Sequence, residues 1–185
     1  MRPLFLIGFM ACGKSTLLQA LAARVPGRTY IDLDSETERL AGKSIPAIFA
    51  EDGEERFRQL ESEVLASLCD SDAIVACGGG TPCRPGAMDA MLEAGTVVWL
   101  KADTDITIQR LALAPGQRPV IDNLIDNPEA LRSKVESLMA EREPYYSRAT
   151  AVFDSSRLDD EHQIEESARL FIDTFLITTQ SDTNS

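Results

Sequence analysis

Five short runs of apolar residues alternate along the chain with longer segments in which apolar residues recur at every third or fourth position. The short runs predict buried β-strands, and the longer segments predict amphipathic helices. A closing helix, with apolar residues between Ile164 and Phe175, follows the last run. Such alternation is typical of an α/β fold. The five predicted strands cover residues 4–7, 29–31, 73–77, 96–100 and 151–153.

Two segments interrupt this alternation. Residues 35–68 have the apolar spacing of helices but are broken at Gly42 and Gly53, so we expect a helical excursion there and no further strand. Residues 113–127 hold two proline-containing turns and little regular periodicity. Because loops of this length are usually functional or mobile, we predict a mobile lid over this segment.

The chain length bounds the number of domains. With 185 residues and 44% apolar content, the chain can bury one sizeable core but leaves little room for a second domain. We expect a single domain over residues 1–178 and a frayed polar tail over residues 179–185. No apolar stretch is long enough for a signal peptide or a membrane span, so we expect a cytoplasmic protein with reduced thiols, present as a monomer.

The charge balance limits the partners. The net charge of −12 argues against nucleic acid and against an anionic membrane surface, since both need a basic face. Only four of the 18 basic residues are lysine, and arginine is the residue suited to bidentate contacts with carboxylates and phosphates. A compositional habit of the source genome explains this bias about as well. The four cysteines lack C-x-x-C spacing and the single histidine is distant in sequence, so we expect no zinc site.

The strongest motif lies between the first predicted strand and the first predicted helix. Residues 8–15 read G-x-x-x-x-G-K-[ST], and a match by chance in a chain of this length is below roughly 1%. In such a loop the backbone N–H groups and the helix N-terminus face an anion, Lys14 places its ammonium against the outer phosphates, and Ser15 offers a hydroxyl to Mg²⁺. The motif therefore predicts a nucleoside triphosphate with magnesium; a glycine turn that binds nothing is the alternative.

Two aspartates follow the second predicted strand, where open α/β sheets place their ligands. Strand alternation would point Asp32 and Asp34 to the same side, and like charges so close repel unless a cation or a donor lies beside them. The alternative is a pair of solvated turn aspartates, of which Asp34, with Ser35, caps the next helix.

Two arginines lie on helices that also carry apolar stripes. Glu61 follows Arg58 by three positions, a spacing that lets the carboxylate orient the guanidinium, and a solvated ion pair is the alternative. Arg142 continues an apolar stripe near a helix end that we place before Pro144. We expect its side chain to point into a polar pocket rather than to snorkel to the surface.

Three consecutive glycines, Gly78, Gly79 and Gly80, directly follow the third predicted strand. Glycine allows the backbone to approach a ligand closely and to present N–H groups without obstruction by a side chain. A plain tight turn would not need three glycines, so we expect these residues to contact a ligand.

Taken in order, these motifs resemble the shikimate kinase family over residues 4 to about 158. The resemblance implies a P-loop NTPase fold similar to that of the nucleoside monophosphate kinases, with a five-stranded parallel sheet, helices on both faces and a lid. It also implies transfer of the γ-phosphate of ATP to the 3-hydroxyl of shikimate, a step in aromatic amino-acid biosynthesis. The motifs are the glycine loop, Asp32-Leu33-Asp34, Phe57-Arg58-Gln59-Leu60-Glu61, Gly78-Gly79-Gly80, Arg118-Pro119 and Arg142-Glu143-Pro144-Tyr145-Tyr146.

The resemblance also implies a role for each matching residue. ATP would contact Ala11, Cys12, Gly13, Lys14, Ser15, Thr16, Arg110 and Arg118, and the loop 154–157 would flank the adenine with Arg110. Shikimate would contact Asp34, Arg58, Gly78, Gly79, Gly80 and Arg142. Ser15 would bind Mg²⁺ directly, and Asp32 would complete the metal shell through water. The catalytic residues would be Lys14, Asp34 and Arg118, with Asp34 positioning the acceptor hydroxyl and able to deprotonate it.

This chain departs from the family pattern at the glycine loop. Ala11 stands where the family usually has glycine, and Cys12 stands where it has alanine or serine. If the backbone at Ala11 needs a positive φ, its methyl group costs on the order of 1 kcal/mol and loosens nucleotide binding without abolishing it. The three glycines also occupy the position of the acidic residue that other P-loop enzymes use for the metal, which leaves that task to Asp32.

Two other functions fit part of the pattern. A gluconate kinase would share the glycine loop and the lid, but the two arginines Arg58 and Arg142 favour an anionic acceptor of matching geometry. A nucleotide-dependent switch or a non-catalytic binding module would leave the pairs of arginines and aspartates unexplained, and the chain has no N-K-x-D guanine signature. Phosphoryl transfer to an acid would separate these alternatives.

Overall fold

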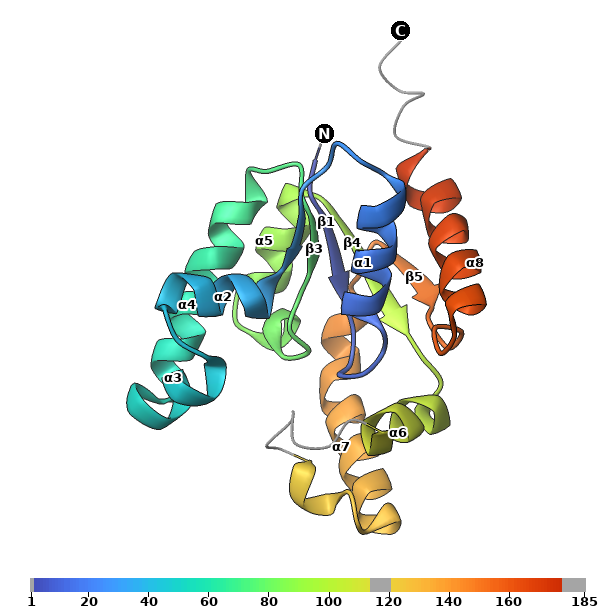
Figure 1. The fold of residues 1–185 in the computed structure, drawn as a ribbon. Coiled ribbons are helices and arrows are strands. Elements are labelled where there is room, and N and C mark those ends of the chain that lie inside the picture. The colour runs from blue at the N-terminus through green and yellow to red at the C-terminus, as the bar shows by residue number, and fades with distance from the viewer. Residues whose placement is uncertain (1, 114–120, 178–185) are drawn as a thin grey trace, which may run out of the picture.

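The computed structural model describes residues 2–113 and 121–177. Its five strands form one sheet in the order β2-β3-β1-β4-β5, and every neighbouring pair is parallel. Figure 1 shows β1 at the centre of this sheet. The five-stranded parallel sheet predicted above is therefore confirmed. The strands are β1 (Leu4–Ile7), β2 (Tyr30–Asp32), β3 (Ile74–Ala76), β4 (Thr96–Lys101) and β5 (Ala151–Asp154).

Eight α-helices and three shorter helical turns connect or extend the described strands. The expected excursion between the second and third strands consists of three helices and contains no strand. The α-helices are α1 (Lys14–Arg24), α2 (Leu33–Ala41), α3 (Ile45–Glu51), α4 (Gly53–Cys69), α5 (Ala87–Ala94), α6 (Thr104–Leu113), α7 (Pro128–Tyr146) and α8 (Glu161–Phe171). The short turns are η1 (Thr81–Cys83), η2 (Asp122–Leu124) and the π-helical turn η3 (Ile172–Leu176).

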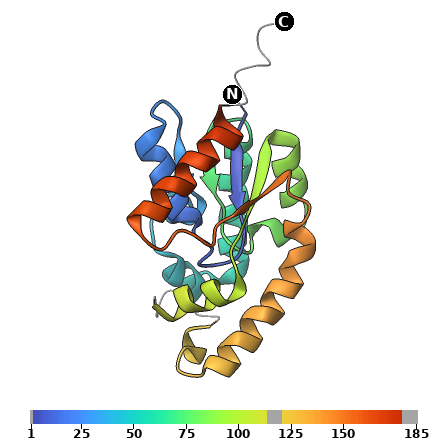
Figure 2. The ribbon, with the colours of Figure 1, turned by 90° about the vertical axis from the view of Figure 1, so that its right-hand side faces the viewer.

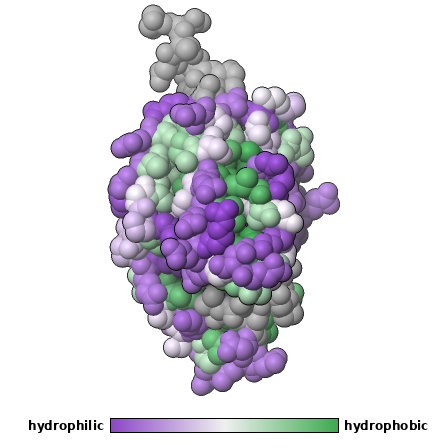
Figure 3. Space-filling view, turned by 90° about the vertical axis from the view of Figure 1, so that its left-hand side faces the viewer, coloured by the Kyte–Doolittle hydropathy of each residue, from purple (hydrophilic) through white to green (hydrophobic). Residues whose placement is uncertain are grey.

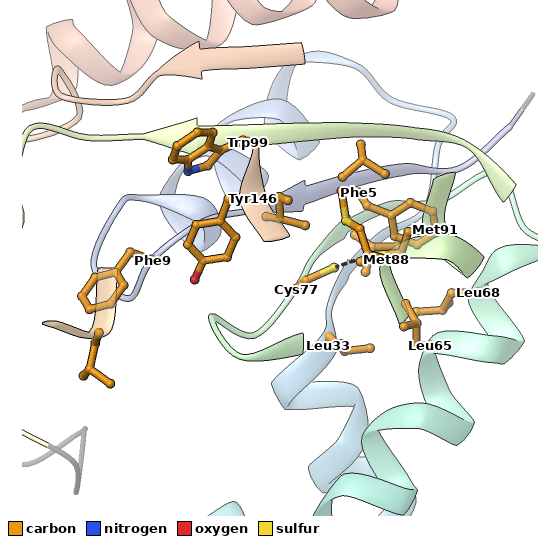
Figure 4. Packing of buried hydrophobic residues seen from close by; sticks show 14 of the residues in the cluster. Phe5, Phe9, Leu33, Leu65, Leu68, Cys77, Met88, Met91, Trp99 and Tyr146 are labelled. Carbon is orange, nitrogen blue, oxygen red and sulfur yellow. Dashed lines mark hydrogen bonds between the residues drawn. The ribbon is translucent and has the colours of Figure 1, made fainter. Parts of the chain in front are cut away.

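Helices cover both faces of the sheet (Figures 1 and 2). Successive side chains along a strand point to opposite faces, so each strand packs against helices on both sides. In β1, Leu4 and Leu6 pack in a core with residues of α1 and α8, as Figures 1 and 2 show for the ribbon. Phe5 and Ile7 pack in a second core with residues of α4, α5 and α7. Figure 4 shows this second core, in which Phe5 lies near Met91 of α5. The central strand is thus buried from both sides, which explains why it is apolar throughout.

The strand register brings the predicted site residues to one edge of the sheet. Leu6 and Asp32 are both level with Ala76, although they belong to strands on either side of β3. The segments that follow these strands therefore start side by side at the carboxyl end of the sheet, where α/β sheets bind ligands. The segments are the glycine loop after β1, the start of α2 after β2, and the glycine turn after β3.

The structure corrects the prediction for Asp32 and Asp34. Helix α2 begins at Leu33, so Asp34 belongs to its first turn and strand alternation does not relate the two aspartates. The helix cap is Asp32, whose Oδ1 accepts hydrogen bonds from the backbone N–H groups of Asp34 at 3.1 Å and Ser35 at 3.3 Å. An aspartate that accepts these N–H groups satisfies donors left free at a helix start, which explains why the helix begins directly after the strand.

Helix α7 does not end before Pro144, as expected, but continues through it to Tyr146. Proline removes one backbone donor, yet the helical ladder resumes after it, with Ser147 N–H donating to Glu143 C=O at 2.9 Å. The added turn carries Tyr146 into the core, where it is 2% exposed. Burial of this ring explains why the helix continues past its proline.

Other expectations are corrected or lie outside the described residues. The closing helix changes to a π-helical turn after Phe171, with Ile177 N–H donating to Ile172 C=O at 3.1 Å. The lid prediction falls mostly on residues 114–120, including Arg118, and the tail prediction on residues 179–185, all outside the described residues. Within the described part of the chain, no helix combines the length and apolarity needed to cross a membrane.

Candidate active site

The glycine loop between β1 and α1 closes tightly at its two motif glycines. Gly8 has φ +143° and Gly13 has φ +94°, a region that side chains rarely adopt. A Cβ on Gly8 would lie 2.4 Å from the carbonyl oxygen of Leu100, and one on Gly13 would lie 2.4 Å from Leu158 Cδ1. Both positions therefore require glycine, for conformation and for space.

Ala11 is the one described residue other than glycine with a positive φ, at 58°. This value lies in the left-handed region, where the methyl group of alanine is strained by roughly 1 kcal/mol. The backbone at Ala11 therefore has the positive φ on which the predicted cost of its methyl group depends, and glycine would adopt this conformation freely. Its neighbour Cys12 is buried, with Sγ 3.7 Å from Lys14 Nζ, so its side chain is enclosed by the loop.

The N-terminus of α1 is open to an anion. Gly13 is its N-cap, no side chain accepts the free N–H groups there, and the first turn carries no acidic residue. Lys14 Nζ donates to the carbonyl oxygens of Gly8 at 2.9 Å and Phe9 at 2.8 Å, which holds the ammonium against the loop. The loop therefore gathers N–H dipoles and one positive charge at a single point.

Next to this loop lies a pair of oxygen atoms suited to a hard cation. Ser15 Oγ donates to Asp32 Oδ2 at 2.7 Å, so a hydroxyl and a carboxylate from different elements meet. Mg²⁺ is usually bound by one or two protein oxygens together with substrate phosphates. Among the described residues, no group of three or more His, Cys, Asp or Glu side chains could hold a metal. The Ser15 and Asp32 oxygens fit a metal that a nucleotide helps to bind.

Asp34 is a partly buried carboxylate with other negative charges beside it. Burial is the main cause that raises its pKa, to about 6, and the nearby carboxylates of Asp32 and Glu61 raise it further. Lys14 opposes this shift, and Glu38 adds to it. A carboxyl group with this pKa exchanges its proton near neutral pH, as a general base requires.

The acceptor side of the site contains a buried network around Glu61. Its side chain is 4% exposed, and Oε2 accepts from Arg58 Nη1 at 3.1 Å. Oε1 accepts from Thr81 Oγ1 at 2.5 Å. The pairing predicted from spacing is confirmed, and the solvated alternative is wrong because the carboxylate is enclosed. Glu54 holds the other side of the guanidinium, with Oε1 3.1 Å from Arg58 Nη2.

The glycine turn after β3 packs closely against this network. A Cβ on Gly78 would lie 3.0 Å from Asp34 Oδ1 and 3.2 Å from Glu61 Oε1. None of the three glycines of the turn has a positive φ, so space and not conformation restricts side chains at Gly78 and Gly79, whereas a Cβ on Gly80 would come no closer than 3.8 Å to Arg58 Nη1. A Cβ on Gly79 would lie 3.2 Å from Arg142 Nη1, which places that arginine at the same turn.

Arg142 reaches this site from α7. Its side chain is partly buried, with Cζ 5.4 Å from the centre of the Phe9 ring, so it turns inward, while its expected place in a polar pocket stays a prediction. Burial raises the pKa of Cys83, and the positive charges of Arg142 and Arg58 oppose that change. The two guanidinium groups come from different helices, α4 and α7, and both lie near the glycine turn, with Arg58 Nη1 3.8 Å from the position of a Cβ on Gly80.

Two cavities meet beside the glycine turn, one of about 620 Å³ and the other of about 740 Å³. Both are lined by Asp34, Gly78 and Gly79. The first also contains the phosphate-loop residues Ala11, Gly13, Lys14, Ser15 and Thr16, with Asp32 and Arg110. The second also contains Arg58, Glu61, Gly80 and an apolar wall of Ile45, Pro46, Phe49, Ala50 and Phe57. Asp34 thus lies at the junction of a phosphate-binding cavity and an amphipathic one.

Arg110 closes the far end of the first cavity. It donates to the carbonyl oxygens of Ser155 and Ser156, each at 3.0 Å, and Nε donates to Asp159 Oδ1 at 2.6 Å. Helix α6 is thereby tied to the loop that follows β5, as expected if the two flank one ligand. Sequence reasoning missed Leu158, which packs against Gly13, because no motif marks it.

Comparison with known proteins gives consistent matches. The family model described as Shikimate kinase matches residues 10–174. A shikimate kinase from Phocaeicola vulgatus is 37% identical over 168 residues, 90% of this chain and 94% of the relative. The structure of a shikimate kinase from Bacteroides thetaiotaomicron matches with a TM-score of 0.84 and 31% identity, over 93% of this chain and 97% of that one. A shikimate kinase from Acinetobacter baumannii, solved in complex with shikimate, matches with a TM-score of 0.79 and 27% identity, over 98% and 95% of the chains.

Proposed function

Because the chain belongs to the shikimate kinase family and phosphorylates shikimate with ATP, we propose that the two cavities bind these substrates and that Asp34 acts where they meet. The observation that carries this proposal is the shared lining of the cavities by Asp34, Gly78 and Gly79. A phosphoryl group passes between two substrates only if both reach one point, and this junction offers one. The products are shikimate 3-phosphate and ADP.

The nucleotide occupies the cavity of about 620 Å³. The loop N–H groups and Lys14 hold the β- and γ-phosphates, while Arg110 and the loop 154–157 flank the adenine. Ser15, directly, and Asp32, through water, would hold Mg²⁺, which would neutralise charge on the phosphate oxygens. We assign Arg118, in the proposed lid over residues 113–127, to the charge on the transferred phosphoryl group.

Shikimate occupies the cavity of about 740 Å³. Arg58 and Arg142 bind its carboxylate, since two guanidinium groups can each give charge-assisted hydrogen bonds to it. The buried Glu61 carboxylate fixes Arg58 before shikimate arrives, so little side-chain entropy is lost on binding. The apolar wall around Phe57 covers the ring, and the glycine turn gives access to its hydroxyl groups.

Asp34 accepts a hydrogen bond from the 3-hydroxyl of shikimate. In-line transfer needs the hydroxyl oxygen aimed at the γ-phosphorus, with little covalent chemistry supplied by the protein. The raised pKa of Asp34, about 6, allows this carboxylate to take the hydroxyl proton at neutral pH as the new O–P bond forms. The ADP oxygen then leaves on the nucleotide side of the junction.

The variant Asp34→Asn tests this assignment. It keeps the size of the side chain but removes the proton acceptor, so turnover should fall at least about 100-fold while the KM for ATP changes less than about twofold. Glu36→Gln is the matched control, because Glu36 lies on the same helix and pairs with Arg39. Turnover in Asp34→Asn within threefold of the wild-type value would overturn the assignment.

We also propose that the enzyme acts in the cytoplasm as a monomer of one domain over residues 1–178, without a nucleic-acid or membrane partner. The net charge of −12 and the four free thiols support this proposal. The face in Figure 3 is covered mostly by hydrophilic side chains, with smaller hydrophobic areas between them. Light scattering after gel filtration should give the mass of one chain, 20.2 kDa.

A further inference from the structure

Tyr146 connects the end of α7 to the glycine turn. Tyr146 is 2% exposed, and the centre of its ring is 5.7 Å from the centre of the Trp99 ring. Figure 4 shows the two rings side by side. The Tyr146 hydroxyl donates to the carbonyl oxygen of Gly79 at 2.6 Å, across 67 positions of the sequence. None of the roles proposed above involves this residue.

The bond acts on a part of the backbone that has little stiffness of its own. A peptide unit between two glycines can rotate at small steric cost, because neither residue has a Cβ. The peptide plane is rigid, so the carbonyl of Gly79 and the N–H of Gly80 point in opposite directions. When Tyr146 holds the carbonyl on the side of α7, the N–H is directed away from that helix. Within the described residues, no group of the protein accepts this N–H.

The same helix also brings Arg142 to the turn. This arginine lies one helical turn before Tyr146, and its Nη1 is 3.2 Å from the position of a Cβ on Gly79. Burial raises the pKa of the Tyr146 phenol, while the neighbouring charge of Arg142 opposes the change. The phenol therefore keeps its proton at neutral pH and remains a hydrogen-bond donor.

We infer that Tyr146 is a positioning residue for the acceptor. Its hydroxyl holds the Gly79–Gly80 peptide so that the Gly80 N–H is available to shikimate. The same hydrogen bond sets the distance from the turn to Arg142. The inference rests on the proposed placement of shikimate in the cavity that Gly80 lines. Without the hydroxyl, the peptide can rotate, and the site presents a carbonyl oxygen to an anionic substrate for part of the time.

Tyr146→Phe tests the inference, since it removes one oxygen and keeps the ring against Trp99. The dissociation constant of shikimate, measured by calorimetry, should rise about 5- to 20-fold, while the KM for ATP should change less than about twofold. Tyr145→Phe is the matched control, because Tyr145 is 40% exposed, and it should behave as the wild type. Unchanged shikimate affinity, or equal losses for shikimate and ATP, would overturn the inference.

A second measurement follows the Gly80 amide directly. In protein labelled with ¹⁵N-glycine, the amide signal of Gly80 should shift when shikimate is added to the wild type, and the shift should be smaller in Tyr146→Phe. A wild-type Gly80 amide that does not respond to saturating shikimate would overturn the inference. The role of Asp34 is tested separately by turnover of Asp34→Asn, so the two proposals can fail independently.

Discussion

Ser15 and Asp32 share a hydrogen bond of 2.7 Å, although they belong to segments separated in the sheet by β3. Strand β3 ends at Ala76 and is followed by Cys77 and Gly78, so no acidic residue stands at this strand end. Other P-loop enzymes carry an acidic residue at this strand end. In this chain the acidic residue comes from β2, and the glycine leaves space for the acceptor.

Lys14→Ala should abolish most phosphoryl transfer and leave the fold intact. The ammonium acts on charge that develops between the β- and γ-phosphates, and its contacts with the protein are to loop atoms, two carbonyl groups and the Cys12 thiol. We expect turnover to fall at least about 100-fold with a thermal midpoint within a few degrees of the wild-type value. Lys43→Ala, which removes a surface lysine paired with Glu51 and Asp52, is the control. Near-normal turnover in Lys14→Ala would contradict the role of the loop.

Asp34 should destabilise the folded protein at neutral pH. Its pKa is raised from 3.8 to about 6 in the fold, so the folded state binds the proton more tightly than the unfolded state. The free energy of unfolding therefore falls as pH rises from about 4 to about 6, by roughly 2–3 kcal/mol. Asp34→Asn should raise the thermal midpoint at pH 8 and leave it nearly unchanged at pH 4. A variant that is less stable than the wild type at pH 8 would refute this.

Arg142→Lys separates simple attraction from bidentate recognition, because it keeps the charge and removes the planar fork. Losing one of two parallel charge-assisted bonds should cost roughly 1.5–3 kcal/mol, or about one to two decades in kcat/KM for shikimate. ATP affinity without shikimate should hardly change. Arg148→Lys, on a surface arginine paired with Asp89, should be neutral. If calorimetry finds unchanged shikimate affinity in Arg142→Lys, the carboxylate is bound by Arg58 alone.

Ala11→Gly should improve nucleotide binding modestly. The alanine has φ 58°, and glycine adopts this conformation without the methyl clash. Glycine also increases the freedom of the unbound loop, which offsets part of the gain. We expect affinity for ATP to rise by less than about fivefold, measured by titration calorimetry. Weaker binding in Ala11→Gly would mean that stiffness of the loop matters more than its strain.

The sheet, and the grouping of most candidate site residues at one edge of it, could be predicted from the sequence because both depend on local patterns. Alternating apolar runs identified the strands, and the loop around Lys14 is a compact motif between a strand and a helix. The inward direction of Arg142 and the pairing of Arg58 with Glu61 follow from helical spacing, and the structure agrees with both.

What the sequence could not predict depends on contacts between distant segments. A helix end placed before Pro144 does not predict the bond from Tyr146 to Gly79, although Tyr146 continues the apolar stripe of α7 four positions after Arg142. The start of α2 was misplaced because Asp32 completes a strand and caps a helix at once. Neither Thr81 nor Leu158 belongs to a motif, and only the folded chain brings them to the site.

The most direct test of the account is the rate of ADP formation with Mg-ATP in the presence and absence of shikimate, with gluconate as an alternative acceptor. A site that joins two cavities at Asp34 predicts rapid ADP formation with shikimate, and little without an acceptor or with gluconate. Shikimate 3-phosphate should appear in equal amount to ADP. ADP formation that does not depend on shikimate, or that gluconate supports equally well, would contradict the account.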